Sequence, residues 1–151
     1  MNVFIRIASS FLSSFLISFT LAYINTVPES ERLSNTYYFS FFDQFMLLFI
    51  VLLLIYIVVA VLYSIGVDNQ LRTMKVSTSI REMIAILLYI VGGFITVFIF
   101  FGLLTGLSYR GFVIGSVLYG GAFALVYYLV TRMLQFVCIR ILKNRGSRHA
   151  L

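Results

Sequence analysis

Long uncharged and mostly apolar stretches alternate with short polar segments along the whole chain. The four stretches are Ile7–Pro28, Gln44–Val67, Met83–Tyr109 and Gly111–Thr131. Each has at least the roughly 20 residues that a helix needs to cross the ~30 Å hydrocarbon core of a bilayer. The pattern therefore predicts an all-α fold, an integral membrane four-helix bundle forming a single transmembrane domain. The expected helices cover residues 3–24, 41–65, 83–104 and 112–134 approximately.

Two of the polar segments carry signals for the start of a helix. Ser40 precedes Asp43 with the spacing of a capping box, in which a side-chain oxygen accepts from a backbone N–H of the first turn. Ser79 and Glu82 have the same spacing directly before an apolar run. We therefore expect Ser79 to mark the start of the third helix, with Glu82 as its reciprocal cap.

The composition agrees with a chain that lies almost wholly in lipid. Hydrophobic residues make up 62% of the chain and charged residues 11%, whereas a soluble domain carries about 25% charged residues. The net charge is +6, from 11 Lys and Arg against 5 Asp and Glu. In this context the expected partner is a bilayer with an anionic inner leaflet, and no nucleic acid is expected.

The positive charges lie mainly on one side of the predicted bundle. Nine of the 11 Lys and Arg residues fall at the N-terminus, between the second and third helices, or from the end of the fourth helix onward. The positive-inside rule places these segments in the cytoplasm, so we expect a multi-pass protein of the cell (plasma) membrane with both termini cytoplasmic. The first apolar stretch is longer than a typical signal-peptide core, which predicts a retained helix and not a cleaved leader.

Small residues recur at helical spacing within the apolar stretches. Ser10, Ser14 and Ser18 fall every four residues and therefore lie along one ridge of the first helix. Glycines supply the corresponding positions in the third and fourth helices: Gly92, Gly93, Gly102, Gly106, Gly111, Gly115 and Gly120. Small residues allow helices to approach closely in membranes, so these positions are helix-packing candidates. The alternative is that the serine ridge lines a hydrophilic path.

The C-terminal segment predicts a basic amphipathic extension of about residues 135–151. Apolar positions follow helical spacing at its start, and such a stretch either continues the fourth helix or lies along the inner membrane surface. The candidates for contact with anionic lipid are Arg132, Arg140, Lys143, Arg145 and Arg148.

Reactive side chains are scarce. Cys138 and His149 are the only cysteine and histidine, which excludes an internal disulfide and leaves too few ligands for a zinc or haem site. No charged residue or histidine falls near the centre of a predicted helix. We therefore expect no catalytic, cofactor-binding or metal-binding residues, and no enzymatic activity.

Tyr56, Tyr89 and Tyr119 fall deep in the predicted helices, and we expect serines of the first helix to bond their hydroxyls.

The segments SSFLISFTLAYINTVPE and FGLLTGLSYRGFVIGSVLYGGAFALVYYLV give the chain a resemblance to a known group. The chain resembles small four-helix multi-pass membrane proteins of Gram-positive bacteria to which no activity is assigned. The resemblance implies a location in the cell membrane and transfers no functional residues.

The sequence as a whole favours a non-enzymatic membrane protein that acts through helix–helix or protein–protein contacts. An accessory subunit, an immunity factor or an exclusion factor fits this pattern, with a protein partner or a homo-oligomer as the contact. The alternative is an oligomeric pore, a holin-like protein or a small carrier, in which the serine ridge of the first helix lines water.

Overall fold

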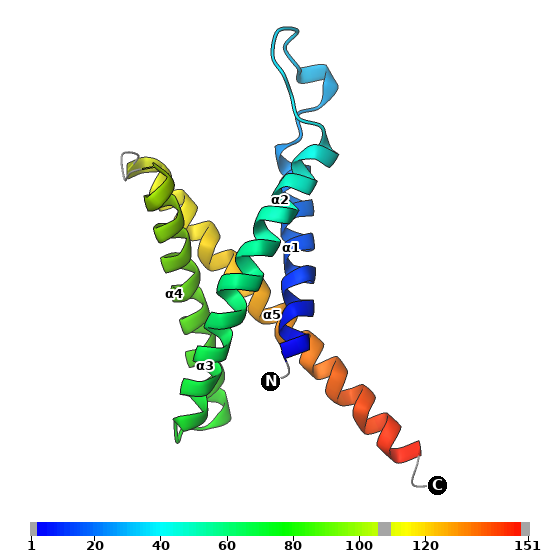
Figure 1. Cartoon of the computed structure of the whole chain (residues 1–151), viewed down its shortest axis with the longest axis vertical. Coiled ribbons are helices and arrows are strands. Elements are labelled where there is room, and N and C mark those ends of the chain that lie inside the picture. The colour runs from blue at the N-terminus through cyan, green and yellow to red at the C-terminus, as the bar shows by residue number, and fades with distance from the viewer. Residues whose placement is uncertain (1–2, 106–109, 149–151) are drawn as a thin grey trace.

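The computed structural model describes the backbone of residues 3–105 and 110–148, and the side chains of residues 3–99 and 118–140 (Figure 1). Every element in these ranges is helical, which confirms the predicted all-α class. In chain order the elements are α1 (Val3–Asn25), the 3-10 turn η1 (Glu29–Glu31), α2 (Phe41–Ile55), the π-helical turn η2 (Tyr56–Ala60), α3 (Val61–Thr73), α4 (Thr78–Thr105) and α5 (Arg110–Arg148).

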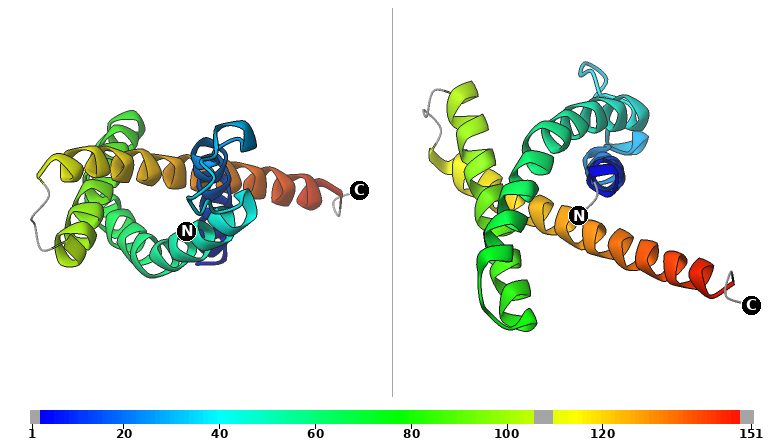
Figure 2. Two further views of the ribbon diagram at one scale, coloured as in Figure 1. Left: turned by 90° about the horizontal axis from the view of Figure 1, so that it is seen from above. Right: turned by 60° about the horizontal axis from the view of Figure 1, so that its bottom comes forward.

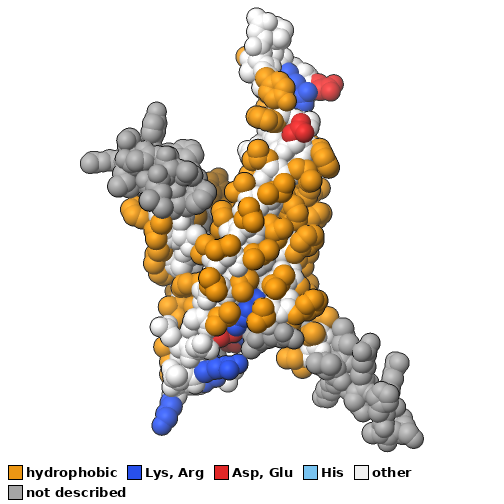
Figure 3. Space-filling view, viewed as in Figure 1, with side chains coloured by type: hydrophobic (Ala, Val, Ile, Leu, Met, Phe, Trp, Pro, Cys, Tyr) orange, Lys and Arg blue, Asp and Glu red, His pale blue; other side chains and the backbone are white. Residues whose placement is uncertain are grey.

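Within the described residues, four helical segments are long and apolar enough to cross a membrane, as the sequence predicted. They are Val3–Asn25, Phe41–Thr73, Thr78–Ile99 and Leu118–Arg140. Charged side chains gather at the two ends of the molecule, and a broad band of hydrophobic side chains separates them (Figure 3). This distribution matches the layering of a bilayer, with an apolar core between two polar interfaces.

The second span is longer than the sequence indicated. We expected it to end near residue 65, but α2, η2 and α3 form one run of 33 residues. At 1.5 Å per residue this run is about 50 Å long, which exceeds the ~30 Å hydrocarbon core. The added length contains Asp68, which we expected in a connecting loop. Its carboxylate pairs with Arg6 inside the bundle.

The start of α4 also differs from the prediction. The helix begins at Thr78, and Ser77, not Ser79, lies at its cap. The backbone N–H of Ile80 donates to Ser77 Oγ at 3.5 Å, and the N–H of Arg81 donates to Ser77 O at 3.0 Å. Glu82 makes no reciprocal cap because its carboxylate pairs with Arg132 on α5.

The cap predicted for α2 is confirmed. Ser40 Oγ accepts a hydrogen bond from the backbone N–H of Asp43 at 3.2 Å and donates to Asp43 Oδ2 at 2.6 Å. The carboxylate of Asp43 therefore lies at the N-terminus of α2, where the helix dipole favours a negative charge. This arrangement begins the second span at a defined residue.

α1 and α2 form an antiparallel pair held by phenylalanines. Their rings meet edge to face in three steps, at centroid distances of 5.3 Å for Phe11–Phe49, 5.5 Å for Phe15–Phe45 and 5.4 Å for Phe19–Phe41. The residues recur every four positions on both helices, so the rings form one continuous row. Such aromatic pairs add about 0.5–1.5 kcal/mol each beyond their burial, and the row sets the register of the pair.

α4 and α5 form the second antiparallel pair, and glycines bring their backbones together. A Cβ atom built on Gly93 would overlap Gly120 of α5, with its carbonyl carbon 2.9 Å away, and would lie 2.7 Å from Ala124 Cβ. A Cβ atom on Gly120 would lie 2.6 Å from Gly93 O. Only glycine permits this approach, because backbone atoms cannot move aside as a flexible side chain can.

The two pairs join at one end and separate at the other. α5 crosses α1 near the start of α1, and α3 contacts α4 at the same end (Figure 1). Among the described residues α2 has almost no contact with α4 or α5, and the backbones of the two pairs diverge in a V toward the opposite end, as the further views also show (Figure 2). The start of α1, the α3–α4 connection and the end of α5 all lie at the joined end.

Gly93→Ala should destabilise the protein, because the added methyl group meets the backbone of Gly120. Overpacking of this kind costs about 1–3 kcal/mol, which corresponds to roughly 5 °C in the unfolding midpoint of a chain of this size. Thermal unfolding in detergent, followed by size-exclusion chromatography, measures it. Gly66→Ala is the matched control, because nothing lies within 4 Å of a Cβ at this position. Equal midpoints for the two variants would contradict the close approach.

Candidate functional site

The serines of α1 face the interior of the bundle. Ser10, Ser14 and Ser18 are each 0% exposed, as are Ser9 and Ser13. Ser10 Oγ donates to Arg6 O at 3.0 Å, and Ser14 Oγ donates to Ser10 O at 2.7 Å. These are bonds from a side chain back to the preceding turn of the same helix, which satisfy a hydroxyl without a partner on another helix. The serines therefore allow α5 to pack closely against α1.

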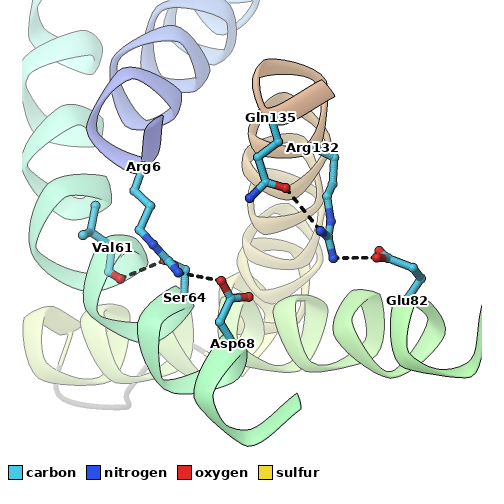
Figure 4. Close-up of polar contacts among 7 residues, drawn as sticks. All are labelled: Arg6, Val61, Ser64, Asp68, Glu82, Arg132 and Gln135. Carbon is cyan, nitrogen blue, oxygen red and sulfur yellow. Dashed lines mark hydrogen bonds and ion pairs between the residues drawn. The ribbon is translucent and has the colours of Figure 1, made fainter. Parts of the chain in front are cut away.

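Arg6 continues this ridge and carries a buried charge. It lies four residues before Ser10, and only 2% of it is exposed. Its Nη2 pairs with Asp68 Oδ2 at 2.6 Å, and its Nη1 donates to Ser64 Oγ (Figure 4). Ser64 Oγ in turn donates to Val61 O at 2.8 Å. The pair connects α1 to α3, and it is what allows a guanidinium to be buried, since an unpaired charge in this position would be strongly unfavourable.

A second ion pair connects α4 to α5. Arg132 Nη2 lies 2.8 Å from Glu82 Oε1, and both side chains are about two-fifths exposed. Tyr128 OH donates to Glu82 Oε2 and accepts from Arg132 Nε at 3.2 Å. The guanidinium also lies over the Tyr128 ring, 5.2 Å from its centroid. Arg132 Nη1 donates further to Gln135 Oε1 at 3.2 Å (Figure 4).

A small polar cavity lies between the two pairs. Its volume is about 10 Å³, and its lining includes Asp68 from the first pair and Arg132 from the second, together with Thr131. This volume is close to the minimum for one water molecule with polar partners. We call the set of Arg6, Ser64, Asp68, Glu82 and Arg132 the polar belt. Its two ion pairs join the first span to the second and the third span to the fourth, both at the joined end of the molecule.

Tyrosines form a layer between the polar belt and the rest of the bundle. Tyr56, Tyr89 and Tyr127 are at most 5% exposed, and we call these three residues the tyrosine floor. Tyr56 and Tyr127 stack at 5.4 Å between ring centroids, and Tyr89 lies 6.2 Å from Tyr127. The hydroxyl of Tyr89 interacts with Ser64 and Asp68 of the belt. The hydroxyl of Tyr127 is buried near Ser10 and Ser64 and has no hydrogen-bond partner among the described residues. The hydroxyls of Tyr89 and Tyr127 thus lie on the side of the belt.

The hydrogen-bond partner that we predicted for Tyr56, a serine of α1, was wrong. Its hydroxyl donates to the backbone carbonyl of Phe123 on α5 at 2.8 Å, not to a serine of α1. Tyr56 begins the π-helical turn η2, where the second span departs from regular α-helical spacing. Such turns often coincide with functional positions in helices. Tyr119, which we also expected to be deep, is 60% exposed.

Beyond the tyrosine floor an apolar crevice opens between the two helix pairs. It contains a cavity of about 250 Å³ whose wall is almost wholly apolar. The residues that shape it most directly are Leu52, Ile55, Val59, Ala60, Val97 and Phe123. Two hydroxyls of the lining are bonded internally: Tyr63 OH donates to Leu88 O at 2.6 Å, and Thr96 Oγ1 donates to Gly92 O at 2.8 Å. The crevice therefore offers shape and apolar contact.

The predicted small-residue positions divide into three groups in the structure. Gly93 and Gly120 lie at the α4–α5 contact, whereas Gly92 lies under the ring of Tyr63, which a Cβ would approach to 2.5 Å. None of the three serine candidates lies in the lining of the apolar cavity. Four further glycine positions fall outside the residues whose packing the structure describes: Gly102, Gly106, Gly111 and Gly115.

The basic candidates for lipid contact also differ in their surroundings. Arg132 is engaged by Glu82 and Tyr128, whereas Arg140 is exposed on α5. Lys143, Arg145 and Arg148 lie on α5, but their side chains are outside the described residues. Among the described residues no group of three or more His, Cys, Asp or Glu side chains could hold a metal ion.

The sequence analysis missed the pairing of Arg6 with Asp68, although a signal was present. Arg6 precedes the serine ridge by one four-residue step, and Asp68 follows Ser64 by the same step. A charge on each of two facing ridges is the pattern that an interhelical ion pair needs.

No protein-family model, curated protein or solved structure matches the chain.

Asp68→Asn should lower the stability substantially, because it leaves the buried Arg6 charge without a counterion. Breaking a buried pair costs about 3–5 kcal/mol, and the partial exposure of Asp68 reduces this to about 2–4 kcal/mol. Glu82→Gln breaks the more exposed pair and should cost at most about 1 kcal/mol. Thermal unfolding in detergent compares the two. Joint replacement by Arg6→Met and Asp68→Leu should recover most of the loss; continued instability would contradict the charge argument.

Proposed function

We propose that this chain is a non-enzymatic multi-pass protein of the cell membrane that acts through contacts with another membrane protein or with a second copy of itself. The role that fits is that of an accessory subunit, an immunity factor or an exclusion factor. The observation that carries the proposal is the apolar crevice, flanked by two helix pairs that have almost no contact with each other there.

Many polar side chains inside the bundle bond to one another or to the backbone, which supports a role without catalysis. The belt charges form ion pairs with each other, and Ser10 and Ser14 bond within their own helix. A catalytic site needs a reactive group that can reach a bound substrate. The crevice instead presents hydrocarbon walls, whose chemistry favours a partner recognised by shape.

The burial of the serine ridge gives less support to a pore, a holin-like protein or a carrier. A water path along Ser10, Ser14 and Ser18 requires these hydroxyls to face an opening, but each is 0% exposed among the chain's own helices. Oligomerisation alone does not expose them, because the helices that cover them belong to the same chain. The two helix pairs would first have to separate.

The proposed orientation places both termini and the α3–α4 connection in the cytoplasm. Support comes from the nine Lys and Arg residues that belong to this side of the sequence, against two on the other. In this orientation the exposed Arg140 and the basic residues that follow it on α5 would lie near anionic headgroups. The polar belt would lie in the cytoplasmic half and the crevice would face the outer half of the bilayer.

Reporter fusions test the orientation. Alkaline phosphatase inserted after Ser34 should be active, because the connection between α1 and α2 is expected outside the cytoplasm. Green fluorescent protein fused after Leu151 should be fluorescent. The reverse pattern, with an inactive phosphatase and a dark C-terminal fusion, would overturn the proposed topology.

Crosslinking in living cells tests the contact role. A photoreactive phenylalanine analogue at Val51, which lines the crevice and is 42% exposed, should give a discrete adduct with a partner protein or a second copy. Leu62 is the matched control, because it lies on the same continuous helix, is 66% exposed and does not line the crevice. The Leu62 position should crosslink to lipid alone. Identical protein adducts from both positions, or none from Val51, would contradict the role.

A further inference from the structure

We propose that the cavity at the base of the crevice is a binding site for one acyl chain of a bilayer phospholipid. This inference goes beyond the proposed contact role and does not depend on it. It rests on the chemistry of the cavity wall, on the volume of the cavity and on its position in the four spans.

The wall of the cavity selects hydrocarbon. Its apolar residues come from several helices: Leu21 from α1, Leu52 from α2, Val97 from α4 and Phe123 from α5. The hydroxyl of Tyr56, at the start of η2, is bonded to Phe123 O at 2.8 Å. An occupant with a polar group would lose its hydrogen bonds on entry without replacement, which is unfavourable. Water is excluded for the same reason, since apolar cavities stay dry.

The volume is sufficient for part of an acyl chain. The cavity holds about 250 Å³, and an apolar cavity of roughly 150 Å³ is already large enough to bind benzene. The cavity therefore has room for the end of a hydrocarbon chain.

The position gives lipid direct access. The lining residues belong to all four candidate membrane spans, so the mouth of the cavity faces the hydrocarbon layer. Val51 and Val59 line the cavity and remain 42% and 38% exposed, which places them toward the mouth. The tyrosine floor closes the other end, because all three of its residues line the cavity.

Two substitutions reduce the space inside the cavity. Ala60→Leu adds three carbon atoms to a lining position on η2, and Val59→Phe adds a ring beside it. Val58→Phe is the matched control for the second, because Val58 is 58% exposed and does not line the cavity. Both variants fill the same cavity, so if one of them fails to fold, the other still measures lipid binding. Each variant is first required to elute as a single symmetric peak in detergent.

Native mass spectrometry of the full-length protein with dioleoylphosphatidylglycerol measures the binding. The unmodified protein should retain one phospholipid after detergent is removed in the gas phase. Ala60→Leu and Val59→Phe should reduce the retained fraction at least tenfold, and Val58→Phe should leave it unchanged. Dioleoylphosphatidylcholine should be retained equally well, because the cavity contacts the chain and not the headgroup.

Several results would overturn the proposal. The unmodified protein could retain no lipid, or the cavity variants could retain as much lipid as the unmodified protein. The protein could also retain a second protein chain in place of the lipid. Retention of phosphatidylglycerol alone would assign the binding to the basic residues and also overturn it. The crosslinking of Val51 reports protein contact separately, so failure of the acyl-chain site and failure of the proposed function are distinguishable.

Discussion

The guanidinium of Arg6 lies inside the bundle, and the position of α1 depends on how its charge is balanced. A buried cation is tolerated only with a counterion and hydrogen bonds, and Asp68 and Ser64 supply both from α3. The first span is therefore fixed to the far end of the second. The Glu82–Arg132 pair connects the remaining two spans at the same level, with Tyr128 between them. Charge pairing at one end thus fixes each of the two helix pairs, and the hydroxyls of Tyr56 and Tyr63 bond from one pair to the other.

The crevice follows from this uneven distribution of contacts. Polar bonds between helices are concentrated at the joined end, and beyond the tyrosine floor each helix pair is held mainly by its own contacts. Phenylalanines such as Phe15 and Phe45 align α1 with α2, and Gly93 and Gly120 bring α4 to α5. Neither set reaches across to the other pair. The two pairs diverge there, and an apolar space remains between them.

The proposed contact role and the proposed acyl-chain site fit this architecture for related reasons. A protein whose polar side chains are used to hold its helices together has little chemistry to offer a substrate, but it can present a shaped apolar surface to neighbours in the bilayer. The exposed walls suit a transmembrane partner, and the apolar cavity at the base suits a hydrocarbon chain. A bound chain would also fill the space between the pairs and so stabilise the surface that a partner meets.

The sequence by itself determined the four spans, the all-α class and the cap at Ser40, because hydropathy over 20 residues and capping are local properties of a chain. It also placed Ser10, Gly93 and Gly120 on small-residue ridges. It did not determine the helix ends around Asp68 and Ser77, the ion pairs or the crevice. Arg6 and Asp68 are 62 residues apart, and hydropathy alone places both at the polar ends of spans. Only the tertiary structure decided that these two charges meet inside the bundle, because that depends on which helix faces pack together.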